Sequence, residues 1–554
     1  MRWGTKAGTS SPMLLLAGNC LNLSIFRRGA AQRLLSAVCA AALLCTGGAP
    51  LAFAQNNLPA LGDTASEDFN LGTERKLGDQ IMREIRRDPD YIDDPLLLEY
   101  LQSVWQPLVA AARQRGEIGA DIDQRFAWEP FLVRDRSVNA FALPGGFVGV
   151  HLGLIAMTAS RDELASVLAH EMSHVTQRHI ARSSANSNRQ SLFSAAAMIL
   201  GVLAASRSNK GDAANAVIAG GQAAAIQGQL NFSRDMEREA DRIGFAVMTT
   251  AGFGAGGMAA MFEKLDQASR FNASGGFPYL RSHPLTTERI GEARSRMGTA
   301  STVLPASALD HTLAQARARV LMDPRVDALR RWQALDGDAS NAGVVANPAN
   351  ASTSLGDKLA AACSSALASS LLREWARADK SLLRASTLLQ GGPRIDARAE
   401  RAVALLSAQS MLERGDIARA AELLKSYAAE ASRPVLLMSA RVAQGPQPDP
   451  VRLSRSADDL QTWVALHRVD ADAWSALGQV WGALGQPLRS LRADAESRLA
   501  LGDTIGAIDR LRAGQRLAKR GGTVDFIEAS VIDSRLRDIE LQRKRQASDE
   551  KDLK

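Results

Sequence analysis

The hydrophobic positions of this chain change their spacing from one region to the next, and each spacing predicts a different element. Between residues 71 and 115, apolar side chains recur every three or four positions, which predicts helices. The stretches RFAWEPFLVRD (125–135) and NAFALPGGFVGVHLGLI (139–155) are short and apolar, with a Pro144-Gly145-Gly146 turn in the second, and they predict strands. Beyond residue 355 the spacing is helical almost throughout.

Two further helices are predicted in the middle of the chain. The stretch SRDELASVLAHEMSHVTQRHIAR (160–182) predicts an amphipathic helix, with Ser160 as its N-cap and acidic residues in its first turn. The stretch NFSRDMEREADRIGFAVMTTAG (231–252) predicts another helix, which leads to a loop with the sequence SHPLTTERI (282–290). These patterns indicate a mostly α protein with one small β-sheet.

Two apolar segments, 192–206 and 213–228, lie between those helices. Each has about 15 residues, whereas a helix that crosses a bilayer needs about 20. One interpretation is a buried helical hairpin. The other is a pair of helices that touch a lipid surface or gate a site, which their low charge favours. The sequence leaves both open.

The C-terminal part predicts helical repeats. The polar stretch DGDASNAGVVANPANASTS (336–354) is rich in small and helix-breaking residues and predicts a linker. After it, WSALGQVWGALG (474–485) matches the start of a tetratricopeptide repeat, with Trp474, Leu477, Gly478 and Trp481 at the expected spacing. We therefore expect an all-α domain of helical hairpins.

The N-terminal residues predict export. Three arginines at 27, 28 and 33 precede the apolar run LLSAVCAAALLC (34–45), and Ala52-Phe53-Ala54 fits a signal cleavage site. Three of the four cysteines would leave with this signal peptide, so the mature chain would keep Cys363 alone and form no internal disulfide.

Composition changes this picture little. The chain has 554 residues, and its net charge of +7 comes from 66 basic and 59 acidic residues. Those charges are interleaved and aromatic residues are only 5%, which indicates a solvated surface and no nucleic-acid partner.

The sequence HEMSH (170–174) is the strongest sign of chemistry. His170 and His174 stand one turn apart on one face of the predicted helix, where two imidazoles can bind one metal ion. Glu171 follows the first histidine and can reach a water on that metal. The pattern therefore predicts a zinc hydrolase site.

A hydrolytic zinc site needs a third protein ligand. The candidates are His179, His151, His283 and the acidic residues near 237. His179 lies five residues after His174, ~500° around a continuous helix, so we expect it to point away, either supporting a ligand from outside or lying at the surface. His151 is expected to end a strand.

The acidic helix offers a carboxylate pair. Glu237 and Asp241 share one face, so Glu237 could bind metal while Asp241 holds a ligand histidine through its ring N–H. Glu239 is expected to point elsewhere, into solvent. The alternative is an exposed charged helix with no role in the site.

Together, HEMSH, SRDMEREAD, SHP and NAFALPGG resemble the HtpX-like zinc peptidases, and the likeness runs from about Leu71 to Ile290. The resemblance implies an α+β gluzincin-type fold with one Zn²⁺ per chain on His170, His174 and Glu237. It implies that Glu171 is the general base. His283 and Arg289 are the candidate donors to the oxyanion, and the resemblance suggests that His283 instead occupies the open metal position and keeps the enzyme latent.

With its predicted export signal and repeats, the chain resembles the periplasmic members of this family, and the resemblance implies a protease and chaperone that acts in outer-membrane protein assembly. The expected function is hydrolysis of peptide bonds in misfolded or stalled envelope proteins, with Glu171 activating a zinc-bound water. Substrate would pair with an exposed strand edge in GGFVGVHL (145–152). The alternative is a chaperone or assembly factor that acts through its repeats while the protease stays latent.

We accordingly expect the chain to bind unfolded proteins, and to contact the outer-membrane assembly machinery through its repeats. Contact with a membrane surface stays open. The expected organisation is a signal peptide (1–54), a zinc peptidase domain (55–335), a linker (336–354), a repeat domain (355–545) and a polar tail (546–554).

Overall fold

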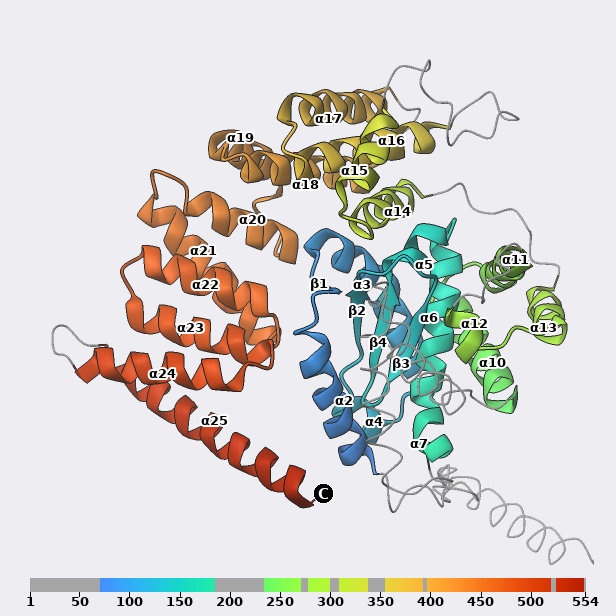
Figure 1. The fold of residues 1–554 in the computed structure, drawn as a ribbon, viewed down its shortest axis with the longest axis horizontal. Helices are drawn as coiled ribbons and strands as arrows, with labels where there is room; N and C mark the ends of the chain where they lie inside the picture. Colours follow the sequence, from blue (N-terminus) through green and yellow to red (C-terminus); the bar gives the residue numbers. More distant parts are fainter. Residues whose placement is uncertain are drawn as a thin grey trace, which may run out of the picture. The chain divides into compact units, whose positions relative to one another are not determined.

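The computed structural model describes residues 70–184, 234–270, 278–298, 308–336, 354–391, 396–519 and 525–552 (Figure 1). The predicted signal peptide, the apolar segments 192–206 and 213–228 and most of the predicted linker lie outside these residues. The described part is mostly helical and contains one four-stranded sheet, as the sequence predicts.

The sheet has the strand order β1-β2-β4-β3, with β1 at Tyr91–Ile92, β2 at Glu129–Val133, β3 at Ala140–Leu143 and β4 at Phe147–His151. Strands β2 and β4 are parallel, and β1 and β3 are antiparallel to their neighbours. The predicted Pro-Gly-Gly turn joins β3 to β4, with φ values of 78° and 87° at its two glycines. The predicted strand stretches are too long at two places: Arg125 ends helix α4 (Ala120–Arg125), and LGLI after His151 begins helix α5 (Leu152–Met157). Strand β1, which lies within the region predicted as helices, was not predicted.

The free edge of the sheet differs from the predicted one. The stretch 145–152 was expected to supply an edge, but β4 pairs with β2 on one side and β3 on the other. Within the described residues the two edge strands are therefore β1 and β3, and β3 is the one next to β4. Alternation of apolar residues identifies a strand but not which neighbours it pairs with, so the prediction was wrong on this point.

Alternate residues of the strands face two separate cores. Leu132, Val148 and Val150 join the larger core with helices α3 (Pro95–Gln114), α5, α6 (Arg161–Thr176), α10 (Arg234–Thr250) and α11 (Gly256–Arg270). Phe131 and Val133 face the other way and pack against helix α2 (Leu71–Ile85). The shorter helices of this part are α4 (Ala120–Arg125), α7 (His179–Ser184), α12 (Pro278–Ser282) and α13 (Thr287–Met297).

Helix α6, which carries HEMSH, is buried on every side rather than amphipathic as predicted. Ser160 caps it as predicted, accepting a hydrogen bond from the backbone N–H of Glu163 at 3.2 Å. Every residue from 163 to 176 is buried, because α10, α11, α3 and the sheet surround the helix. The polar side chains of HEMSH therefore face protein groups rather than bulk water.

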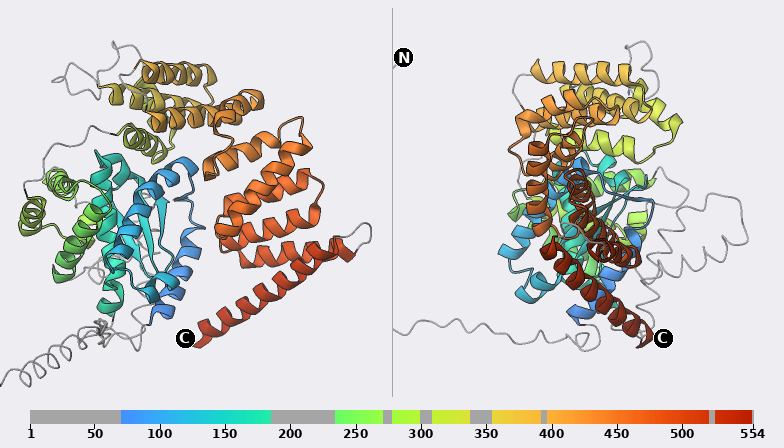
Figure 2. Two further views of the ribbon diagram at one scale, coloured as in Figure 1. Left: turned by 180° about the vertical axis from the view of Figure 1, so that it is seen from behind. Right: turned by 90° about the vertical axis from the view of Figure 1, so that its left-hand side faces the viewer.

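The C-terminal part is built from helices that pack against their neighbours in sequence (Figure 2). The motif residues Leu477 and Trp481 are buried on α22 (Ala471–Ala483), and Gly478 allows α22 to approach Ala493 of α23 (Pro487–Ala500). In the described part of the chain, none of the helices combines the length and apolar character needed to span a membrane. The elements are α14 (Leu309–Leu321), α15 (Val326–Ala334), α16 (Leu355–Leu371), α17 (Trp375–Gln390), α18 (Ala397–Glu413), α19 (Ile417–Leu424), the 3-10 turn η2 (Lys425–Tyr427), α20 (Arg433–Ala443), α21 (Pro450–Leu466), α22 (Ala471–Ala483), α23 (Pro487–Ala500), α24 (Thr504–Lys519) and α25 (Phe526–Asp552).

Helix α14 connects the sheet-containing part to these helices. Ala314 and Ala318 pack into the larger core around α6, whereas Leu313 and Val320 pack with α16, α17 and α18. Partly buried ion pairs of 2.6 to 2.7 Å at the start of α3 add to this contact: Arg317 with Asp94, Arg401 with Glu99 and Arg433 with Asp93.

Gly244 sets how closely α10 approaches α6. A Cβ atom at this position would lie 3.0 Å from the backbone of Ala169 and of His170, tighter than ordinary van der Waals contact. The small residue therefore lets the acidic helix lie directly against the HEMSH helix.

We expect Gly244→Ala to lower the free energy of unfolding by about 1–2 kcal/mol, because the overpacking cost exceeds the gain in helix propensity. Gly291→Ala is the matched control, since Gly291 is an exposed residue of α13 with open space where the added methyl group would lie. There the change should stabilise the protein by about 0.5–1 kcal/mol. Urea unfolding of both variants checks this, and equal stabilities would contradict it.

Candidate metal centre

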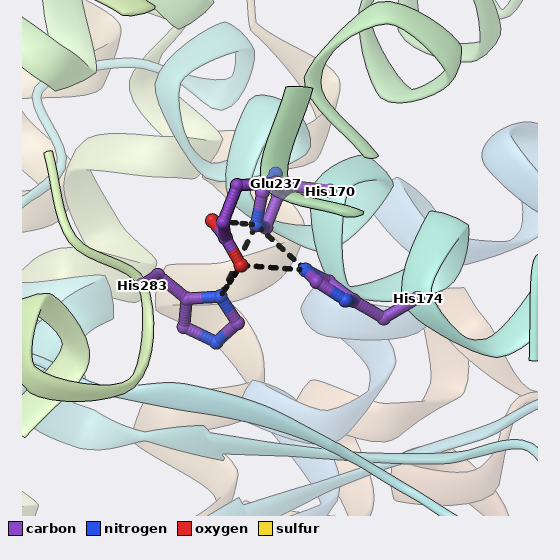
Figure 3. A group of neighbouring side chains, drawn as sticks. All are labelled: His170, His174, Glu237 and His283. Carbon is purple, nitrogen blue, oxygen red and sulfur yellow. Dashed lines mark hydrogen bonds and ion pairs between the residues drawn. The ribbon is translucent and has the colours of Figure 1, made fainter. Parts of the chain in front are cut away.

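Four buried side chains from separate parts of the chain converge on one point (Figure 3). His170 and His174 come from α6, Glu237 from the first turn of α10, and His283 directly follows α12. Their donor atoms all lie within 4.8 Å of one another. The Nε2 atoms of His170 and His174 are each 3.4 Å from a carboxylate oxygen of Glu237, and His283 Nδ1 is 3.0 Å from Glu237 Oε1. The structure thus brings the three predicted metal ligands together with His283.

Asp241 and Arg289 lie directly behind these donors. Asp241 Oδ1 is 2.9 Å from His170 Nδ1, the ring nitrogen that faces away from the cluster. Arg289 donates to both oxygens of Asp241, from Nε at 2.6 Å and from Nη2 at 2.8 Å. Its Nη1 is also 2.8 Å from Glu237 Oε2. The guanidinium of Arg289 therefore holds the two carboxylates of α10 in place.

The charges of this buried group fit a divalent cation. With the histidines neutral, as they must be to bind a metal, the ionised carboxylates of Glu171, Glu237 and Asp241 carry three negative charges and Arg289 one positive charge, which leaves two negative charges for a cation. Burial alone would lower the pKa of His170, but Glu237 and Asp241 raise it to about 10. Two imidazoles and a carboxylate are also the ligand types that zinc prefers. The donor set therefore suits Zn²⁺.

Glu171 lies beside the donor cluster and points to the sheet edge. Its Oε2 accepts a hydrogen bond from the backbone N–H of Ala142 on β3 at 3.0 Å. Its Oε1 accepts no hydrogen bond from the described residues, and His283 Nε2 lies 3.5 Å away from it. Burial raises the pKa of this carboxyl. Glu171 therefore has one fixed oxygen and one oxygen ready to accept a proton.

His179 does not point away, because the helix that carries HEMSH ends before it. Helix α6 stops at Thr176, Arg178 adopts a left-handed conformation with φ of 52°, and α7 begins at His179. A non-glycine residue in this conformation costs about 1–2 kcal/mol, and an ion pair between Arg178 Nε and buried Glu74 at 3.1 Å accompanies it. The direction extrapolated along a continuous helix was therefore wrong, whereas one of the two expected roles, support of a ligand histidine from outside, agrees with the contact between His179 and His174.

The change of chain direction at Arg178 buries His179 against the side of His174 that faces away from the donor cluster. The two Nδ1 atoms are 2.9 Å apart, and His179 Nε2 is 3.0 Å from Glu239 Oε2. Glu239 also accepts a hydrogen bond from Arg182 at 2.8 Å, so its assignment to solvent was wrong. Burial lowers the pKa of His179 and keeps its ring neutral. His151 ends β4 as predicted and takes no part in the cluster.

Comparison with known proteins agrees with this geometry. Residues 97–297, from α3 to the end of α13, match the profile of peptidase family M48. The chain carries an M48 peptidase domain. This M48 domain contains every residue of the cluster described above, and metallopeptidases of family M48 use zinc.

Several known proteins are similar to part of this chain. The chain is 33% identical over 278 residues to the beta-barrel assembly-enhancing protease (BepA) of Escherichia coli, which covers 50% of the chain and 55% of that protein. It is 38% identical over 294 residues to a Vibrio cholerae protein that carries the same name provisionally, covering 52% and 56%. It is 34% identical over 163 residues to the mitochondrial metalloendopeptidase OMA1 of Schizosaccharomyces pombe, covering 29% and 44%. The matched segment thus spans about half the length of the bacterial relatives.

Proposed function

We propose that this protein is an exported zinc endopeptidase of gluzincin type that hydrolyses peptide bonds in misfolded or stalled envelope proteins. One observation carries the proposal: buried Glu171, with an oxygen available for a proton, adjoins a cluster of donors suited to zinc. The names of the bacterial relatives, which refer to assembly of beta-barrel proteins, support the choice of outer-membrane proteins as substrates.

In this proposal His170, His174 and Glu237 hold the metal, and Asp241 orients His170 through its ring N–H. Zinc bound there would polarise a peptide carbonyl and lower the pKa of water toward about 7. Glu171 takes a proton from the attacking water and passes it to the leaving nitrogen. Arg289 was a candidate oxyanion donor, but its contacts with Asp241 and Glu237 favour a positioning role. His283 remains the candidate donor.

Strand β3 is the proposed substrate-binding edge. It is one of the two edge strands of the described sheet, and its Ala142 N–H donates a hydrogen bond to Glu171. A substrate that pairs with this edge must be extended, so cleavage would favour unfolded chains over folded ones.

We also propose a periplasmic location, with a signal peptide cleaved near Ala54, and a tetratricopeptide-like repeat domain over 355–545. The stacked helices α16 to α25 offer an extended surface for a client protein or for the outer-membrane assembly machinery.

The alternative function is a chaperone or assembly factor whose protease is latent. The position of His283 favours this alternative. Together with His170, His174 and Glu237 it places four protein donor atoms within 4.8 Å of one another, enough to complete a tetrahedral metal site. Catalytic zinc sites keep one position open for water, whereas closed sites have four protein ligands. Proteolysis would then require His283 to leave the cluster.

The test is cleavage of an unfolded model protein by the wild type and by His283→Ala. If His283 occupies the open metal position in about nine molecules in ten, its removal should speed cleavage about tenfold. A zinc chelator should stop both reactions and added zinc should restore them. His467→Ala, which changes a histidine of the C-terminal helices, should behave as the wild type.

The other outcomes are equally informative. Loss of cleavage in His283→Ala at full zinc content would make His283 a transition-state donor. If neither protein cuts while both hold zinc, the peptidase proposal fails and the chaperone alternative replaces it.

A further inference from the structure

The two histidines of HEMSH are held from behind in different ways. His170 Nδ1 contacts a carboxylate directly, that of Asp241 at 2.9 Å. His174 Nδ1 instead contacts a second imidazole, that of His179, at 2.9 Å. The far nitrogen of His179 then contacts the Glu239 carboxylate at 3.0 Å. We call these last two residues the His179–Glu239 pair.

The direction of each hydrogen bond follows from the chemistry of the groups. His174 Nε2 faces the cluster, 3.4 Å from Glu237 Oε1, so a neutral His174 that offers this lone pair must carry its proton on Nδ1. That N–H donates to His179 Nδ1, which leaves the proton of neutral His179 on Nε2. A carboxylate can only accept, so His179 Nε2–H donates to Glu239. Every group in the series has one consistent role.

We propose that His179 and Glu239 are positioning residues that set the tautomer and ring orientation of His174. The proposal rests on the proposed function only in taking His174 as a metal ligand. Outer partners of this kind fix the ligand nitrogen that faces a metal and raise its basicity.

The residues around the His179–Glu239 pair hold it against His174. The rings of His174 and His179 are nearly perpendicular, at 76°, with centroids 4.8 Å apart. The left-handed Arg178 turns the chain so that His179 meets His174, and Arg182 of the same short helix contacts the Glu239 carboxylate at 2.8 Å. His179 is fully buried, whereas the side chain of Glu239 is 28% exposed.

The test compares two substitutions of His179 in the full-length protein. His179→Phe fills the space but offers no acceptor, whereas His179→Asn places an amide oxygen near the former Nδ1. Zinc affinity, measured by competition with a chelator, should fall about 10–100-fold in His179→Phe and recover most of that loss in His179→Asn. Affinity within twofold of wild type in His179→Phe, or equal losses in both variants, would overturn the proposal.

Glu239→Ala provides a second test that leaves the buried His179 side chain itself in place. Zinc affinity should fall about tenfold, because the tautomer of His179 is no longer set. Asp235→Ala is the matched control, since Asp235 lies on the same helix with its side chain 89% exposed. Equal affinities of these two variants would also refute the proposal. Zinc affinity is measured without substrate. A wild type that binds zinc but cuts nothing would therefore refute the proposed function and leave this inference intact.

Discussion

Glu171→Gln is expected to lower the rate of peptide hydrolysis by about a thousandfold or more while zinc stays bound, since general acid–base catalysis contributes about 10²–10⁴-fold. The amide has nearly the same shape as the carboxylate, and its oxygen can still accept the N–H of Ala142. It cannot accept a proton from water, so the chemical step alone is lost. The rate of cleavage of an unfolded protein and the zinc content per chain are the two measurements.

The control for this variant is Glu288→Gln, which alters a glutamate whose side chain is 62% exposed on α13. Cleavage by this control should match the wild type. If Glu171→Gln still cuts at near wild-type rate, Glu171 is not the base. If it loses zinc as well as activity, the experiment has removed the site and not only the proton acceptor.

Arg289→Met is expected to lower the free energy of unfolding by about 3–5 kcal/mol, the cost of leaving buried charges without their partner. The side chain of Arg289 is 4% exposed and its guanidinium contacts Asp241 and Glu237, both buried. Methionine fills much of the same volume but supplies no charge and no donor. Urea unfolding of the zinc-free protein measures the effect without a contribution from the metal.

Two companion variants define the cause of that loss. Arg289→Lys keeps the charge but not the paired donors, so an intermediate loss is expected. Arg238→Met removes an arginine that is 43% exposed and paired with Asp235, and it should cost less than about 1 kcal/mol. If Arg289→Met keeps full stability and loses only activity, Arg289 is an oxyanion donor as first predicted and not a positioning residue.

The spacing of residues within single elements could be read from the sequence. His170 and His174, like Glu237 and Asp241, lie four apart on one helix, so each pair shares a face whatever surrounds it. The N-cap at Ser160 and the Pro-Gly-Gly turn are likewise local, because the groups that satisfy them lie within a few residues. For such features short-range geometry is sufficient.

Other features depended on contacts between distant segments, and there the sequence was silent or misleading. The insertion of β4 between β2 and β3 places β3, and not β4, at an edge of the sheet. The contacts of Arg289 and the approach of His283 to Glu237 depend on how α12 and α13 pack against α10.

His179 shows the limit most clearly. Its direction could not be extrapolated, because one left-handed residue, Arg178, ends the regular helix just before it. The sequence by itself determined which residues share one face of a helix, and it predicted the zinc chemistry of HEMSH. Only the tertiary structure decided which pairs meet, because that depends on packing between segments that no local spacing encodes.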